Sequence, residues 1–285
     1  MRIIGLAVAL AWAVAGCSVV RLAYNQAPDM LYWWADGYVD FNQTQVPRVR
    51  EAIAAWFGWH RTTQLRDYAD LLARARAQVA EPVTPAVACR WWDDLRERYD
   101  LALEKAIPSM ADLVVTMTPE QLQHMERRFA KGLDEMRADF LRGDLAERQQ
   151  AALKRTVDRF EMIYGRTDEE QRRQIAAGVT ASPFDAERWI AERAARQQDM
   201  IVTLSRVIAQ RSTPEAAQAA LRALAERAER SPRPAYRDHT KRLIEYNCAF
   251  VARIHNLTTQ AQRETAQIKL AGWEADLRSL AANGP

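Results

Sequence analysis

Helical periodicity runs through almost the whole chain, and it restricts the possible folds more than any single motif does. No stretch alternates apolar and polar residues for long enough to form a sheet. Apolar residues instead recur every three or four positions, the spacing that gathers them on one face of a helix. Two clear runs are Leu122, Met125, Phe129, Leu133, Met136, Phe140 and Leu153, Val157, Phe160, Ile163. We therefore predict an all-α fold, an elongated or bundled domain of about seven to eight helices.

Proline and glycine mark where these helices are expected to end. The expected breaks are Pro28, Glu81–Pro85, Pro108, Gly165, Pro183, Pro214 and Ser231–Pro234. Residues 119–164 are expected to form one long helix with a kink near Gly143. The expected organisation is a single all-helical domain over residues 30–285, with a division into two sub-bundles near residues 165–182 as the alternative.

Several helix starts carry recognisable capping residues. Thr118 is followed by Pro119 and then by Gln121, the spacing of a capping box, in which two side chains bond reciprocally to backbone N–H groups. Looser versions of this pattern pair Asn42 with Gln45 and Thr259 with Gln262, although Pro47 leaves Thr44 as another start for the first. Further starts are expected at Thr167 with Glu170 and at Ser182 with Asp185. The capping of helix ends explains all of these motifs without a further function, since each cap contributes about 1 kcal/mol to the stability of its helix.

The N-terminus has the features of an export signal. Ile3 to Val14 is an apolar run of 12 residues after Arg2, too short to span a membrane and typical of a signal-peptide core. The small residues Val14-Ala15-Gly16 before Cys17 resemble the bacterial lipobox. The resemblance implies cleavage of residues 1–16, acylation of Cys17 and a lipidated tether over residues 17–29, anchored by two or three acyl chains. An ordinary secretory signal with a coincidental cysteine is the alternative. Because Ser18 stands where Asp would favour inner-membrane retention, we expect a lipid anchor in the outer membrane of a Gram-negative bacterium, facing the periplasm.

Two cysteines remain after that cleavage, Cys89 and Cys248. Both are bordered by apolar positions of expected helices, and an even number of cysteines in an oxidising compartment invites pairing. We predict a disulfide between them, with two buried reduced thiols as the alternative.

Charge and motif content exclude several classes of function. The 40 basic and 37 acidic residues are too balanced to indicate nucleic-acid binding. The four histidines show no metal-ligand spacing, and the sequence contains neither a nucleophile elbow nor a phosphate-binding loop. We expect no catalysis, no cofactor and no bound metal.

Six of the nine tryptophans lie between residues 33 and 92, namely Trp33, Trp34, Trp56, Trp59, Trp91 and Trp92. They could line a groove for a polypeptide client, or stack on glycan rings such as those of peptidoglycan with help from nearby aspartates. Their helical spacing favours a third interpretation, a core of large rings.

Two resemblances bear on function. The Thr118–Gln121 box and the related motifs at Asn42 and Thr259 resemble the Leu-Thr-x-x-Gln motif of periplasmic chaperones of the Spy and CpxP type, which implies an all-helical cradle for unfolded clients. Met117 and Thr258 replace the usual leucine, and Asn42 replaces threonine. A broader resemblance, to an uncharacterised family of proteobacterial lipoproteins, rests on Tyr24-Asn25, Leu31–Phe41, Trp59–Arg61, Arg66–Leu72 and the closing segment Thr258–Ala281. It implies compartment and fold but no catalytic residues.

Together these features predict an outer-membrane-anchored, periplasm-facing lipoprotein that binds a partner, in an envelope-interaction or chaperone-like role. One alternative is a glycan-binding or glycan-processing protein that uses the tryptophans, and another is a purely structural lipoprotein.

Overall fold

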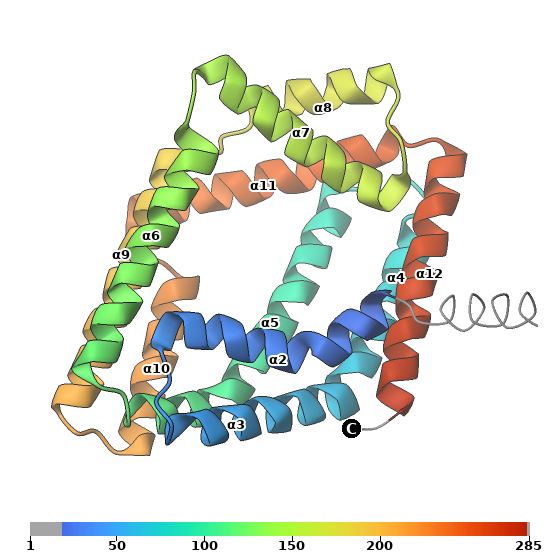
Figure 1. Cartoon of the computed structure of the whole chain (residues 1–285). Helices are drawn as coiled ribbons and strands as arrows, with labels where there is room; N and C mark the ends of the chain where they lie inside the picture. The colour runs from blue at the N-terminus through green and yellow to red at the C-terminus, as the bar shows by residue number, and fades with distance from the viewer. Residues whose placement is uncertain (1–18, 284–285) are drawn as a thin grey trace, which may run out of the picture.

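The computed structural model describes residues 19–283, and every regular element in that range is a helix (Figure 1). This confirms the all-α prediction. The described residues form ten continuous helical rods rather than seven or eight, because several turns act as full breaks. The elements are α2 (Val19–Val39), α3 (Gln45–Trp59), the π-helical segment η1 (His60–Gln64), α4 (Leu65–Gln78), α5 (Pro85–Val114), α6 (Pro119–Leu141), α7 (Leu145–Tyr164), α8 (Glu169–Ala181), α9 (Ala186–Ala209), α10 (Pro214–Glu229), α11 (Pro234–Asn256) and α12 (Gln260–Ala282).

Two of the predicted breaks are wrong. Pro28 lies inside α2 and Pro108 lies inside α5. An interior proline costs about 3 kcal/mol, because it removes a hydrogen bond and its ring crowds the preceding turn. In both helices the flanking residues pack into the core, where Tyr32 is 7% and Ile107 is 3% exposed, and this burial offsets the cost.

The predicted long helix over residues 119–164 is instead two helices, α6 and α7. Gly143 adopts a φ of +80°, a left-handed conformation that glycine tolerates and a continuing helix excludes. Asp144 then caps α7 in a reciprocal box: its Oδ1 accepts from the Glu147 N–H at 2.9 Å, and Glu147 Oε2 accepts from the Asp144 N–H at 3.0 Å. A local capping box therefore replaces the expected kink.

Residues 19–29, which we expected to belong to a lipidated tether, form the first part of α2. Arg21 forms an ion pair with Asp276 of α12 at 3.3 Å, and the Tyr24 hydroxyl bonds His60 Nδ1 at 2.9 Å. These contacts dock the start of α2 onto the body. Cys17 and residues 1–16 lie outside the described residues.

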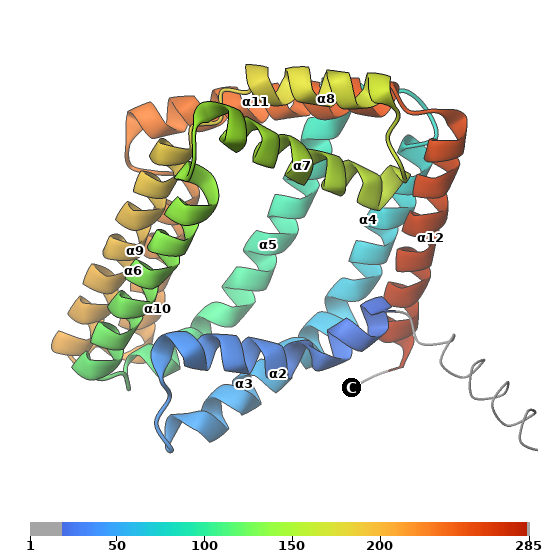
Figure 2. The same ribbon diagram turned by 45° about the horizontal axis from the view of Figure 1, so that its top comes forward.

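The helices outline a four-sided frame that α5 crosses (Figures 1 and 2). One side holds α2 and α3, the next α6 and α9, the third α7, α8 and α11, and the fourth α4 and α12. The contacts repeat in the two halves of the chain: α2 packs on α3 and α6, while α7 packs on α8 and α12. In addition, α6 of the first half packs on α9 of the second, and α12 of the second half packs on α4 of the first. The last helix of each half therefore packs on a helix of the other half.

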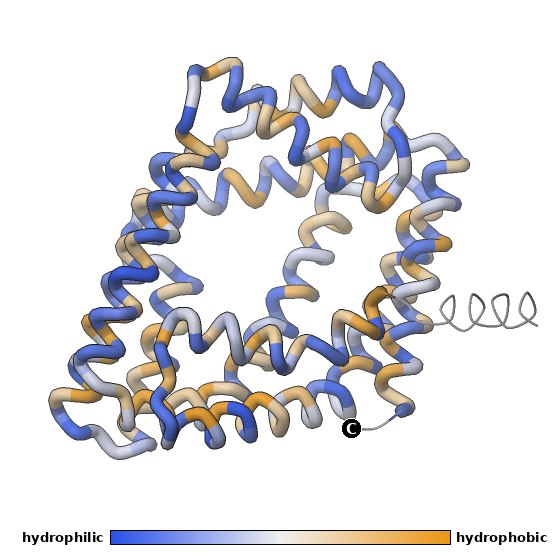
Figure 3. The backbone as a smooth tube through the Cα atoms, viewed as in Figure 1, coloured by the Kyte–Doolittle hydropathy of each residue, from blue (hydrophilic) through white to orange (hydrophobic). Residues whose placement is uncertain are grey.

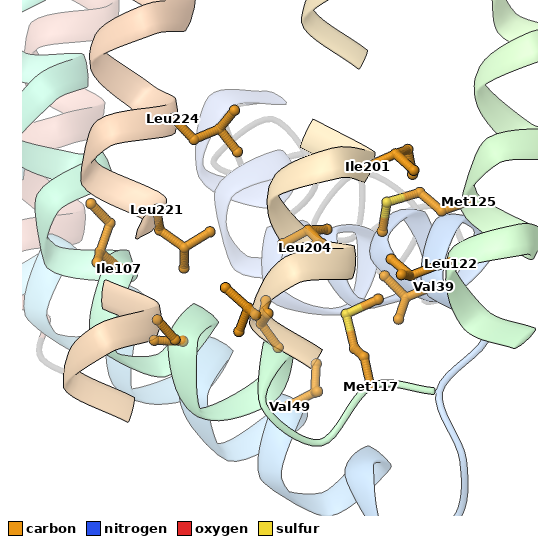
Figure 4. Close-up of a cluster of buried hydrophobic side chains, with 14 of the residues drawn as sticks. Val39, Val49, Ile107, Met117, Leu122, Met125, Ile201, Leu204, Leu221 and Leu224 are labelled. Carbon is orange, nitrogen blue, oxygen red and sulfur yellow. The ribbon is translucent and has the colours of Figure 1, made fainter. Parts of the chain in front are cut away.

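Apolar residues are distributed along every side of the frame rather than in one element (Figure 3). The largest buried cluster joins α2, α3, α5, α6, α9 and α10, with Val49, Ile107, Leu204 and Leu221 among its members (Figure 4). A second cluster joins α4 to α12, and a third joins α7 to α8. Separate cores therefore hold different parts of the frame together.

A disulfide joins Cys89 of α5 to Cys248 of α11, as predicted. The two residues are 159 positions apart in the sequence, and their Cα atoms lie 5.2 Å apart. The bridge links the helix that crosses the frame to the side formed by α11.

Candidate functional site

An open cavity of about 490 Å³ lies between α2, α6, α9 and α10, within the volume range typical of ligand pockets. Its apolar lining combines three methionines with five aromatic residues. Aliphatic residues of α2 and α10 complete this surface, which we call the α2–α9 cavity. The apolar lining is Trp34, Ala35, Tyr38, Val39, Met110, Met125, Phe129, Trp189, Met200, Leu224, Ala228 and Tyr236.

The rings of α2 and α6 form a continuous wall of this cavity. Trp34 and Tyr38 lie one helical turn apart with ring centroids 5.1 Å apart, and Tyr38 lies 5.7 Å from Phe129 of α6. Trp34 is 63% exposed, so a large indole remains accessible at the edge of the cavity. Aromatic contacts of this kind contribute about 0.5–1.5 kcal/mol beyond area burial.

The polar part of the lining comes from α9, which contributes Glu192, Arg193, Arg196 and Gln197. Glu192 is buried, 4% exposed. Its Oε1 accepts from Arg196 Nε at 3.0 Å, and its Oε2 accepts from Arg233 Nε at 2.6 Å. Burial raises the pKa of Glu192, but hydrogen bonds from Arg233, Ser231 and Arg196 outweigh burial and hold this pKa below its usual value. The carboxylate is therefore ionised and already satisfied by protein groups.

Glutamine pairs fix the junction beside this cavity. Gln45 Nε2 donates to Gln121 Oε1 at 3.3 Å, and Gln121 Nε2 donates to Gln45 Oε1 at 2.7 Å and to the Asp40 carbonyl at 2.9 Å. Both predicted boxes are present here: Asn42 N–H donates to Gln45, and Thr118 N–H donates to Gln121. Since Val39 and Met125 lie close by in the sequence, these bonds set how α2 and α6 meet at the cavity.

A second junction repeats this arrangement at the opposite corner. Gln171 Nε2 donates to Gln262 Oε1 at 2.7 Å, and Gln262 Nε2 donates to Gln171 Oε1 at 3.0 Å. The amides also donate to the carbonyls of Leu257 and Arg166. The predicted box of Thr259 and Gln262 is present, so all three predicted cap-and-glutamine motifs belong to two paired junctions.

The two remaining cap predictions are wrong. Asp168, not Thr167, caps α8 and pairs with Gln171, because the Thr167 hydroxyl donates instead to Glu161 Oε1 at 2.6 Å. Asp185, not Ser182, caps α9. The Asp168–Gln171 spacing is the same as in the other boxes and was the available signal in the sequence.

The structure separates the six tryptophans that the sequence grouped. Only Trp34 lines the cavity, whereas its neighbour Trp33 is equally exposed, at 64%, and lies outside the lining. Trp56 stacks on His60, with a centroid distance of 4.9 Å, and Trp59 lies in the same aromatic cluster. Trp91 packs against the core between α4 and α12, while Trp92 is 51% exposed on α5.

Two of the aspartates near these tryptophans use their carboxylates in structural contacts. Asp36 Oδ1 accepts from the Phe41 N–H at 3.0 Å, and Asp93 lies 3.6 Å from Arg96. Within residues 19–283, no group of three histidine, cysteine or acidic side chains could hold a metal ion.

Two histidines, the buried His255 and the half-buried His60, link helices through their imidazole rings. His255 accepts from the Tyr164 hydroxyl at 2.8 Å through Nδ1, because its Nε2 faces the Glu81 carbonyl at 2.9 Å and donates to it. Burial lowers the pKa of His255 and of His60 below 6.5. Both imidazoles are therefore neutral structural links between helices.

The fold and this site define an all-helical protein with an apolar, methionine-rich cavity and paired glutamine junctions. The family of unknown function DUF6279 matches residues 37–237, and the chain belongs to this family. No curated protein and no solved structure matches the chain. Among the described helices, none is both long and apolar enough to cross a membrane.

Proposed function

We propose that this chain is an outer-membrane-anchored lipoprotein that faces the periplasm and binds polypeptide segments in the α2–α9 cavity. Its role is binding rather than catalysis. The observation that carries the proposal is the lining of three methionines and five aromatic rings. Methionine is flexible and polarisable, so surfaces rich in it adapt to clients of different shape.

The proposed compartment is supported by two independent features. The apolar run from Ile3 to Val14 and the small residues before Cys17 resemble a lipoprotein signal. The disulfide between Cys89 and Cys248 fits an oxidising compartment, since such bonds are rare where thiols are kept reduced. A chaperone-like role agrees with the resemblance of the glutamine boxes to those of Spy-type and CpxP-type proteins.

Adjacent tryptophans of α2 provide a matched test of this function. The full chain is expected to suppress aggregation of a chemically unfolded substrate, and Trp34→Ser is expected to reduce that suppression at least threefold, because it removes an exposed ring of the cavity wall. Trp33→Ser removes an equally exposed ring outside the cavity and should leave suppression unchanged.

Equal loss in both variants, or no suppression by the wild type, would contradict polypeptide binding in this cavity. Cosedimentation with purified peptidoglycan that is lost on replacing Trp33, Trp34, Trp91 and Trp92 would support the glycan-binding alternative instead.

A further inference from the structure

The charges around the α2–α9 cavity have one predominant sign. Arg193 and Arg196 belong to the lining, Arg233 bonds Glu192 from α11, and the guanidinium of Arg128 lies 5.5 Å from the centre of the Tyr38 ring. Glu192 is the one acidic residue of the lining. Arg227 pairs with Asp199, whose charge also acts on Arg233, so five arginines accompany two carboxylates.

The Glu192 carboxylate does not neutralise the positive charge at the edge of the cavity. Glu192 is held by two arginines at once, which leaves a positive charge in excess. Arg193 is exposed and has no ion-pair partner within the described residues. Arg196 lies 5.7 Å from the ring centre of Tyr236, a contact that positions its guanidinium at the edge of the aromatic lining.

The same edge contains an unsatisfied hydrogen-bond acceptor. Gln197 lines the cavity, and its Oε1 atom is buried with no hydrogen-bond partner among the described residues. A buried polar atom without a partner is unfavourable, and such atoms in native proteins call for an explanation. Because this Oε1 atom is buried, the Gln197 side chain must rotate to present it to the cavity, where a ligand that brings an N–H donor would supply the missing bond.

We infer that the α2–α9 cavity selects polypeptide segments in which an aromatic or aliphatic side chain is flanked by carboxylates. The apolar side chain enters among Met110, Met125 and Met200, a flanking carboxylate pairs with Arg193 and Arg196, and a backbone N–H donates to Gln197. This inference rests on the proposed function and specifies the chemistry of its clients. Complementary charge gives specificity and faster association more than it gives affinity.

Three blocked peptides test the inference on the full chain reconstituted in lipid nanodiscs, with empty nanodiscs as the blank. They are acetyl-Ala-Asp-Phe-Asp-Ala-amide and its counterparts with Asn or Lys in place of both Asp residues. At low ionic strength the Asp peptide is expected to bind at least tenfold more tightly than the Lys peptide. Added salt should reduce this ratio of affinities, because salt screens exposed charges.

Matched variants locate the effect. Arg193→Glu is expected to remove or reverse the preference for the Asp peptide. Arg90→Glu changes an exposed arginine of α5, about 30 Å along the helix from Met110, and should leave the preference intact. Gln197→Leu is expected to weaken the binding of all three peptides about fivefold. It should not unfold the chain, since it removes an acceptor that has no partner in the free protein.

Failure of the inference and failure of the proposed function give different results. Equal affinity for the three peptides, or an unchanged preference in Arg193→Glu, overturns the charge selection, while suppression of aggregation would still support polypeptide binding. No peptide binding and no suppression together overturn both. Displacement of the Asp peptide by dodecyl phosphate at a lower concentration than by unlabelled peptide would assign the cavity to anionic amphiphiles and overturn the inference.

Discussion

The double variant Cys89→Ser/Cys248→Ser is expected to lose about 3 to 5 kcal/mol of unfolding free energy, the largest single loss that we predict. The disulfide closes a loop of 159 positions, and the entropy that a cross-link removes from the unfolded chain grows with loop length. The bond also joins α5 to α11, two helices that pack directly on each other. Urea unfolding of both proteins under oxidising conditions measures the difference.

A reductant supplies the control for this experiment. Reduction should bring the wild-type unfolding midpoint close to that of the double variant and should leave the variant itself unchanged. Equal midpoints for the two proteins without reductant would show that the disulfide does not stabilise the frame.

The second large effect is expected at the glutamine junctions. Gln121→Ala removes hydrogen bonds to Gln45, to the Asp40 carbonyl and to the Thr118 N–H, and it leaves buried partners unsatisfied. We expect a loss of about 3 kcal/mol, since each unsatisfied buried group costs about 1–3 kcal/mol. Gln171→Ala should lower the free energy of unfolding by about the same amount, because it breaks the equivalent pair with Gln262.

A double-mutant cycle shows whether the paired amides act together. The variant Gln45→Ala/Gln121→Ala should lose less unfolding free energy than the sum of the losses in the two single variants. The difference should exceed about 1 kcal/mol, because each single substitution already breaks the bonds between the two amides. Gln260→Ala is the control. Within residues 19–283 the side chain of this exposed glutamine bonds Glu264 alone, and its removal should change the free energy of unfolding by no more than about 0.5 kcal/mol. Additive losses would contradict the paired junction.

Local signals in the sequence predicted the fold well. Periodicity identified the helices, and cap-and-glutamine spacing identified three of the four boxes that pair, because these features act within one turn of chain. The same rules were wrong at Pro28 and Pro108, where burial of the flanking helix outweighs the intrinsic cost of proline. They also predicted only a kink near Gly143, where one left-handed residue and an adjacent cap separate two helices.

The candidate site could not be predicted in this way. Its lining comes from six helices between Trp34 and Tyr236, and no local pattern reveals which of their faces meet. The sequence grouped six tryptophans by proximity along the chain, but only Trp34 reaches the cavity, while Trp189 was outside that group. Glu192 and Gln197 look like ordinary polar helix residues until α9 is packed against α6 and α10.

Hydrogen–deuterium exchange of the full chain, with and without an unfolded client, tests the central claim most directly. Binding in the α2–α9 cavity predicts slower exchange in the C-terminal part of α2, residues 34–39, and in α9, residues 189–200, with little change along the outer face of α12. Protection confined to α12 or α7, or no protection at a client concentration that suppresses aggregation, would contradict the proposal that this cavity holds the client.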